Sequence, residues 1–286
     1  LRGPSRVRSP PAVPRSISAG MTTLKAVARA GACMTVRYDG FTVDWLGYAT
    51  ARVETPDGYV CYTDPGRYGV LDDYWAKDGD LVLVTHDHHY DSDGIRSVAD
   101  EDATLVIYEG VDPAGIDRDV EPIADLAADY EVVRVEEEDE LEVAASGVAG
   151  DASVVDPAAT VWSVPAYNDP EGPNANADGT VPHPKGLGCG FLVALGGKRL
   201  FWPGDSDALD GFAELDVDLF LANIGGGGIV SDEATAAELA DEMRPELVVP
   251  IHYDTFEQLE ADGEAFAADV AARSVAVALD ERSANQ

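Results

Sequence analysis

The stretch LVLVTHDHHYDSDG at residues 81–94 decides the fold of this chain, because an apolar strand there leads directly into a cluster of histidines. Its first four residues are aliphatic and have the length of a buried strand. His86, His88 and His89 follow the strand at once. Histidines two positions apart in an extended loop can both face one ion, and neutral imidazole is the commonest metal ligand in proteins. The stretch therefore predicts a metal centre at the end of this strand.

The two remaining histidines lie at two further places along the chain. His183 precedes a glycine-rich stretch, and His252 follows the aliphatic run at 247–251. Each of them taken alone has a structural alternative, as a satisfied side chain of the core. Because the histidines gather beside apolar runs, we expect several strand ends to converge on one point and to form a shared metal site.

The composition is strongly acidic. The 286 residues include 54 Asp and Glu against 19 Lys and Arg, which gives a net charge of -35. A dense carboxylate surface with few lysines is typical of proteins in a salt-rich cytoplasm, where salt screens the repulsion between charges; an acidic protein of an ordinary cell is the alternative. The same surface disfavours nucleic acid as a partner. No apolar run approaches the length of about 18 residues that a membrane span needs.

The N-terminal stretch differs from the rest of the chain. Residues 1–33 hold six basic and no acidic residues, so residues 34–286 hold 13 basic and 54 acidic ones, a net charge of -41. Residues 1–33 are rich in proline and lack the apolar core of a secretory signal. We expect them to be a disordered leader that is not native to the protein, with a genuine basic arm as the alternative. Residues 34–286 are expected to form a single domain, because no linker divides them.

The cysteines predict the compartment. Cys33, Cys61 and Cys189 are an odd number and lack the Cys-x-x-Cys spacing of thiolate zinc sites. Neither a disulfide framework nor a thiolate metal site is expected. A reducing cytoplasm is therefore the expected location.

Short apolar runs separated by turns predict a sheet-rich chain. Strands are expected at 41–46, 49–55, 59–63, 81–85, 104–108, 131–135, 141–145, 160–164, 190–195, 198–202, 217–222 and 247–251. Helices are expected at 92–100, 122–128, 232–243 and 256–273. In each half of the chain the strands come first and the helices later. This order favours an α+β fold, with two sheets face to face and helices outside, over a doubly wound parallel sheet.

The histidine loop resembles the His-x-His-x-Asp-His signature of the metallo-β-lactamase fold. The later elements of that fold are present in the same order: His183, Asp205 in WPGDSD at 202–207, and His252 in VVPIHY at 248–253. The resemblance covers almost all of residues 34–286. It implies an αβ/βα four-layer sandwich with two mixed sheets.

Four further strings are similar to one branch of this fold, the L-ascorbate-6-phosphate lactonase-like proteins. The strings are WLGYAT at 45–50, TDPG at 63–66, VPAYN at 164–168 and HY at 252–253. This resemblance implies a metal-dependent hydrolase that acts on a small lactone, another ester or a phosphoester.

The sequence departs from the family signature in its second half. Tyr90 and Asp91 stand where the family carries Asp and His, and a shift by one residue matches Asp91 but puts Ser92 where an imidazole belongs. Two alternatives follow. Either His89 and Asp91 complete a second metal position, or a single ion is held by His86, His88, His183 and Asp205.

The resemblance also implies roles for the site residues. The expected metal ligands are His86, His88, His89, Asp91, His183, Asp205 and His252. Asp205, as a bridging ligand, and Asp91 are expected to take part in catalysis, together with Tyr48. Tyr48 stands where relatives carry His, and it either orients substrate or packs. The expected cofactors are one or two Zn²⁺ or Mn²⁺ ions, and iron fits the same donors.

Two other functions compete with hydrolysis. One is a mononuclear iron oxygenase of the same fold, and the other is a non-catalytic binding protein with a degraded second metal site. Tyr90 and Ser92 are the residues that favour the second. The expected partner is a small-molecule substrate, and the sequence leaves assembly into a homo-oligomer open.

Overall fold

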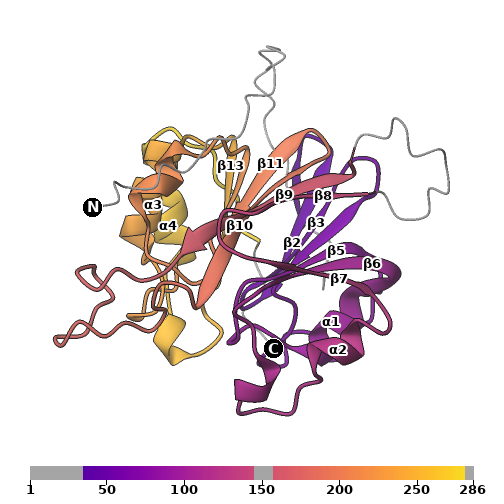
Figure 1. The fold of residues 1–286 in the computed structure, drawn as a ribbon. Helices are drawn as coiled ribbons and strands as arrows, with labels where there is room; N and C mark the ends of the chain where they lie inside the picture. The colour runs from indigo at the N-terminus through magenta and orange to yellow at the C-terminus, as the bar shows by residue number, and fades with distance from the viewer. Residues whose placement is uncertain (1–34, 145–156, 281–286) are drawn as a thin grey trace.

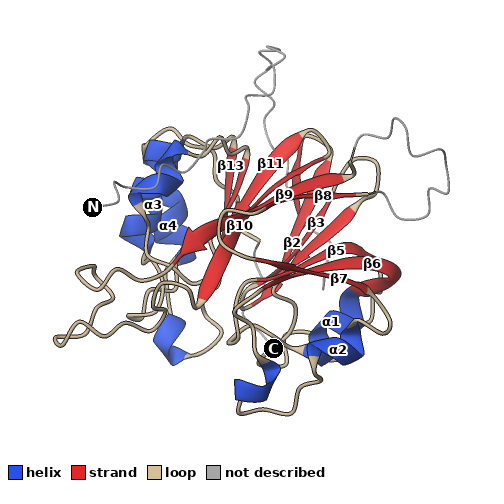
Figure 2. Ribbon diagram, viewed as in Figure 1, coloured by secondary structure: helices blue, strands red, loops and turns tan. Residues whose placement is uncertain are grey.

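The computed structural model describes residues 35–144 and 157–280, which form two β-sheets packed face to face. Figure 1 and Figure 2 show helices on the two outer sides, with the strands between them. The predicted α+β architecture of two mixed sheets with helices outside is confirmed. The expected leader at 1–33 lies outside the described residues, and the single-domain assignment of 34–286 stays a prediction.

The first sheet follows the order of the chain. Its strands among the described residues are β1 (Val36–Tyr38), β2 (Phe41–Gly47), β3 (Thr50–Glu54), β4 (Val60–Thr63), β5 (Gly79–Val84), β6 (Ala99–Tyr108) and β7 (Glu131–Val135). Strands β1 to β4 pair antiparallel, and β4 to β7 pair parallel. Burial alternates along β2, whereas β4 is buried along its whole length. This difference fits a strand with one face on the core and a strand that is covered on both faces.

The second sheet has the order β13-β12-β11-β10-β9-β8. Its strands among the described residues are β8 (Glu140–Val143), β9 (Ala159–Ala166), β10 (Gly188–Leu195), β11 (Lys198–Trp202), β12 (Leu219–Asn223) and β13 (Leu247–Ile251). Strands β8 to β11 pair antiparallel, and β11 to β13 pair parallel. Strands β12 and β13 are buried throughout, as their continuous apolar sequence predicts.

Short helices connect the strands. They are α1 (Ser92–Val98), η1 (Pro113–Gly115), α2 (Ile123–Leu126), η2 (Asp210–Glu214), α3 (Glu233–Met243), η3 (Glu257–Leu259) and α4 (Gly263–Ala272), where η marks a 3-10 turn. Asp232 caps α3, because its side chain accepts a hydrogen bond from the Thr235 amide. None of the helices in the described part of the chain is long and apolar enough to cross a membrane.

The structure differs from the sequence-based expectation at three places. The helix expected over 256–273 begins only at Gly263, because Phe256 packs against Tyr68 and Asp262 caps the helix through the Ala265 amide. Strand β6 begins at 99, where the end of a helix was expected. Strand β1 was not expected at all, since three residues are too few to show an alternating pattern.

The fold brings loops from both sheets to one edge. Parallel neighbours such as β4 and β5, or β11 to β13, present their carboxyl ends at the same edge of a sheet. Strand β10 runs antiparallel to β11, so the segment that precedes β10 reaches this edge as well. The loops after β4, β5, β9, β11 and β13 therefore lie together.

Candidate metal centre

The predicted ligands lie on the loops at this shared edge. His86, His88 and His89 follow β5, Asp205 follows β11, and His252 directly follows β13. His183 comes from the segment before β10. The convergence that the histidine positions predicted is therefore present in the structure, because distances between these side chains are those of direct neighbours.

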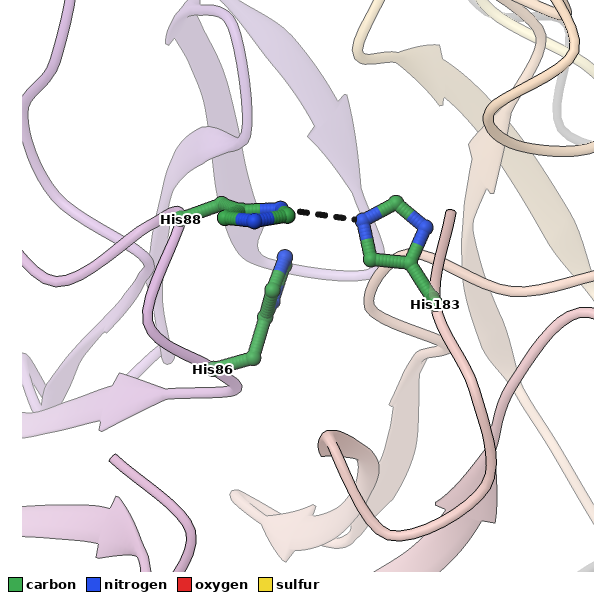
Figure 3. A group of neighbouring side chains, drawn as sticks. All are labelled: His86, His88 and His183. Atoms are coloured by element: carbon green, nitrogen blue, oxygen red, sulfur yellow. Dashed lines mark hydrogen bonds between the residues drawn. The ribbon is translucent and has the colours of Figure 1, made fainter. Parts of the chain in front are cut away.

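Three imidazoles form the first group. Figure 3 shows His86, His88 and His183 with their ring nitrogens directed toward one another, two from the loop after β5 and one from the segment before β10. Nδ1 of His88 lies 3.2 Å from Nε2 of His183. One nitrogen from each ring lies within 4.8 Å of the other two. His86 and His183 are buried, and His88 is exposed.

The carboxylate of Asp205 lies between two sets of imidazoles. Its Oδ2 lies 3.3 Å from Nε2 of His183 and 3.7 Å from Nε2 of His86. Its Oδ1 lies 3.3 Å from Nε2 of His252 and 3.4 Å from Nε2 of His89. The two oxygens of one buried carboxylate thus face different pairs of histidines.

His89 and His252 form the second group. Their Nε2 atoms lie 3.3 Å apart, and both side chains are buried. His252 adopts a left-handed backbone conformation with φ of 60°, which is costly for a residue other than glycine, and its amide donates to the Tyr48 carbonyl. Strain of this kind is common where a functional side chain has to be aimed.

Asp64 orients His89, a role that the sequence did not reveal. This buried carboxylate accepts hydrogen bonds from the amide and hydroxyl of Thr85, at 2.8 Å each, and from Nε1 of Trp202 at 2.7 Å. Nδ1 of His89 lies 2.9 Å from Oδ2 of the same carboxylate. A proton on Nδ1 directs the unprotonated Nε2 toward Asp205, the orientation that a ligand needs. The TDPG string was the only sequence signal for Asp64.

Asn168 orients His183 in a similar way. Its side-chain oxygen accepts from the His183 amide at 3.0 Å and lies 3.1 Å from Nδ1 of the ring. Its Nδ2 donates to Asp207 at 3.0 Å and to the Ile229 carbonyl at 3.0 Å. Asp207 also accepts from the Asp169 amide at 2.8 Å, so one carboxylate fixes the loop that carries Asn168.

Burial keeps most of the imidazoles neutral. It lowers the pKa of His252 to about 4 and the pKa of His86 well below the ordinary value. Burial also lowers the pKa of His183, whereas the ring of the exposed His88 is only partly removed from water, which together with the neighbouring His183 and His89 lowers its pKa. A metal ligand has to be an unprotonated imidazole, so burial prepares these side chains for coordination.

The pKa values of Asp205 and His89 shift in the direction opposite to the one that burial alone would cause. Burial raises the pKa of Asp205, but His89, His252, His183 and His86 outweigh it and hold the pKa well below its usual range. Burial lowers the pKa of His89, but Asp205 and Asp64 outweigh it and raise the pKa. Asp205 is therefore an anion at neutral pH.

The donor atoms fit a divalent metal. Bonds of 2.0–2.1 Å in a tetrahedral zinc shell place neighbouring ligand atoms roughly 3.3 Å apart. Six separations between nitrogen and oxygen atoms of the two groups lie between 3.2 and 3.7 Å. In addition, Nε2 of His86 and Oδ1 of Asp205 are buried and have no hydrogen-bond partner among the described residues. Such atoms are costly unless a cation satisfies them.

The sequence model of one protein family, the beta-lactamase superfamily domain, matches residues 42–252. This range includes every side chain of the centre. The chain belongs to this family. A UPF0173 metal-dependent hydrolase from Salinibacter ruber is 26% identical over 241 residues, which are 78% of this chain and 88% of that protein. The predicted superfamily is thereby confirmed.

Other relatives match this domain over a shorter stretch or with lower sequence identity. A UPF0173 metal-dependent hydrolase from Thermus thermophilus is 38% identical over 107 residues, so the match spans 36% of this chain and 44% of that protein. The metallo hydrolase Igni18 from Ignicoccus hospitalis has a similar structure, with a TM-score of 0.58 and 21% identity. That match covers 84% of this chain and 95% of Igni18. At this identity it shows the shared fold.

Among the described residues, Asp91 is in neither group of neighbouring ligand atoms. Its Oδ1 accepts from the Gly94 amide at 2.9 Å, and its Oδ2 accepts from the Arg67 amide at 3.0 Å. Asp91 therefore caps α1, and its expected role as a metal ligand and catalytic group stays a prediction. Tyr90 donates to the Glu121 carbonyl, and Ser92 accepts from the Glu121 amide.

Tyr48 lies directly over the second histidine group. Its ring centroid is 4.6 Å from that of His252 and 4.9 Å from that of His89. Tyr68 and Phe256 also pack against this ring, with ring centroids 4.9 and 6.2 Å away. Burial, with a further contribution from Asp205, raises the pKa of Tyr48, so its hydroxyl stays protonated. Both alternatives for Tyr48 are therefore compatible with its position, since the ring packs and the hydroxyl can donate.

Proposed function

We propose that this superfamily domain is a metal-dependent hydrolase whose centre holds two divalent ions. The observation that carries the proposal is the position of Asp205, whose two oxygens face two different pairs of imidazoles. A carboxylate in that position can hold one ion with each oxygen. The names of the relatives from Salinibacter and Thermus, both metal-dependent hydrolases, support the proposal.

The ligands divide between the two groups. We assign the first ion to His86, His88 and His183, and the second to His89 and His252, with one oxygen of Asp205 for each ion. This assignment favours the alternative in which His89 substitutes for the missing signature residues. It leaves out Asp91, because two backbone amides already occupy its carboxylate.

The chain's own residues prepare the centre for hydrolysis. When bound, divalent ions in such a site make water acidic enough to act as a nucleophile near neutral pH and stabilise negative charge on a substrate oxygen. Asp64 and Asn168 hold His89 and His183 in one tautomer and orientation. The buried Tyr48 hydroxyl, protonated at neutral pH, can donate a hydrogen bond to a developing oxyanion.

The finer assignments rest on weaker support. Zn²⁺ or Mn²⁺ fits the mixed nitrogen and oxygen donors, and iron is the third candidate. The lactonase-like strings favour a small lactone, ester or phosphoester as substrate. Cys61 and Cys189 are buried free thiols, which supports a reducing cytoplasm, and the acidic composition supports a salt-rich one.

The experiment that tests the centre is metal analysis of purified variants. Protein equilibrated with Zn²⁺ or Mn²⁺ is expected to hold two ions per chain by mass spectrometry of the metal. His183→Ala and His252→Ala are each expected to lose one ion while the fold, followed by circular dichroism, changes little. Lys185→Ala, an exposed cation outside the ligand set, is the control and should keep both ions. Unchanged metal content in both histidine variants would overturn the assignment.

The same preparation separates the competing functions. Release of acid from a panel of lactones, esters and phosphoesters supports hydrolysis. Iron as the native metal, together with oxygen consumption, would instead establish the oxygenase. Protein that stays metal-free in excess Zn²⁺ and Mn²⁺ would establish the non-catalytic binding protein.

A further inference from the structure

Two arginines beside the metal centre have no acidic partner within 4.0 Å among the residues that the structure describes, although the chain carries a net charge of -35. Among the described residues, the arginines with a carboxylate oxygen within 4.0 Å are Arg52, Arg96, Arg134, Arg199, Arg244 and Arg273. In the same part of the chain, Arg67 and Arg118 have none, and neither does Arg37, which is exposed on the edge strand β1. Half-buried cations without an ion pair in so acidic a protein call for a ligand.

Both arginines are attached to the loop that carries the metal ligands. A terminal nitrogen of Arg118 donates to the carbonyls of Asp87, at 3.1 Å, and Tyr90, at 2.9 Å. The amide of Arg67 donates to Asp91, the next residue along the same loop. Burial and then the charge of Arg67 lower the pKa of Arg118, which agrees with two neighbouring cations.

Aromatic rings connect Arg67 to the centre. The guanidinium carbon of Arg67 lies 4.5 Å from the ring centroid of Tyr68, and a terminal nitrogen donates to the Tyr68 hydroxyl at 2.9 Å. The Tyr68 ring packs edge-on against Tyr48 at 4.9 Å, and Tyr48 covers His252. Tyr68 is 55% exposed, so this side of the centre is open to solvent. Nε of Arg67 is buried and has no hydrogen-bond partner among the described residues.

We propose that Arg67 and Arg118 form an anion-binding subsite next to the metal centre, so that the substrate carries a carboxylate or phosphate group apart from the bond that is cleaved. Guanidinium groups bind both anions through paired hydrogen bonds. A local cationic patch is needed because the acidic surface otherwise repels such a substrate. The exposed ring of Tyr68 and the partly exposed ring of Phe256, whose centroids lie 5.1 Å apart, supply apolar contact for the body of the substrate. The inference that this anion is part of a substrate rests on the proposed hydrolase function.

Calorimetric titration with inorganic phosphate, acetate and neutral acetamide tests the subsite. In metal-loaded protein, Arg67→Gln is expected to weaken binding of the favoured anion about tenfold, and Arg67→Gln with Arg118→Gln to weaken it further, because each hydrogen bond to a charged group is lost. Arg37→Gln removes the same charge far from the centre and should bind like wild type. Acetamide binding should not respond to any of these variants. Tighter binding of phosphate points to a phosphorylated substrate, and tighter binding of acetate to a carboxylate.

Two outcomes would overturn the subsite. One is equal anion affinity in the wild type and the double variant, and the other is a wild type that binds neither anion. Arg67→Gln decides the question alone if Arg118→Gln does not fold, because the Arg67 side chain donates to Tyr68 and holds no loop carbonyl. Repeating the titration after chelation separates this proposal from the hydrolase, since the arginines should still bind the anion when no metal is present. Equal metal content in all variants shows that the centre itself is unchanged.

Discussion

Replacement of Asp64 by Asn should damage both stability and the second ion site, although the side chain keeps its shape. Oδ2 of Asp64 is shared by Thr85, Trp202 and His89, and Oδ1 accepts the Thr85 amide. An amide side chain has one acceptor oxygen, so at least one buried donor faces the new NH₂ group. A buried donor left without a partner costs about 1–3 kcal/mol, and the remaining hydrogen bonds lose their charge-assisted strength. We therefore expect the free energy of unfolding to fall by about 3 kcal/mol.

The effect on metal binding has a separate physical cause. Without the carboxylate, Nδ1 of His89 is no longer held as the protonated nitrogen, so Nε2 is less available as a ligand. Loss of such a supporting partner typically weakens metal affinity by about 10- to 100-fold. The second ion should be affected more than the first, because Asp64 contacts His89 directly and is linked to His86 only through the Thr85 hydroxyl.

Two assays separate these effects. Urea unfolding of chelated protein measures the stability term, as a lower midpoint with an unchanged slope. Titration of zinc against a competing chelator measures the affinity of each ion. Asp80→Asn is the matched control, because Asp80 is half-buried on β5 and accepts the Val60 amide away from the centre. Wild-type affinity for both ions in Asp64→Asn would refute the reasoning.

Three further predictions follow from the same structure. Asn168→Ala should weaken the affinity for the first ion by about tenfold or more, because His183 loses its orienting acceptor. A zinc titration that shows no change in affinity would contradict this role. Zinc at 100 times its Kd should raise the free energy of unfolding by about 2.7 kcal/mol for each ion bound, and thermal unfolding with and without chelator measures it; equal stability would argue against a specific site. Burial raises the pKa of Tyr108 to about 12 from 10.0, so its contribution to stability is present below pH 10 and is lost as the pH rises toward 12. Tyr108→Phe should therefore lose less stability than wild type between pH 10 and 12, and parallel urea midpoints over that range would show that Tyr108 does not contribute.

Much of the fold follows from local sequence patterns. Apolar runs predicted most of the strands to within a few residues, since alternation and continuous burial leave a direct trace in the sequence. The helix expected from 256 is the clearest failure. There Phe256 is held by ring contacts with Tyr48 and Tyr68, which lie far earlier in the sequence, and no local pattern carries that information.

The candidate site shows the same division. The sequence alone placed the five histidines and Asp205 at strand ends, because apolar strands and the chemistry of imidazole are properties of short segments. Only the tertiary structure decided that His89 faces the centre while Asp91 caps a helix, that Asp64 and Asn168 orient the ligands, and that Arg67 and Arg118 lack an ion pair within the described part of the chain. These are distances between atoms on different strands, and they depend on how two sheets pack rather than on any one stretch of the chain.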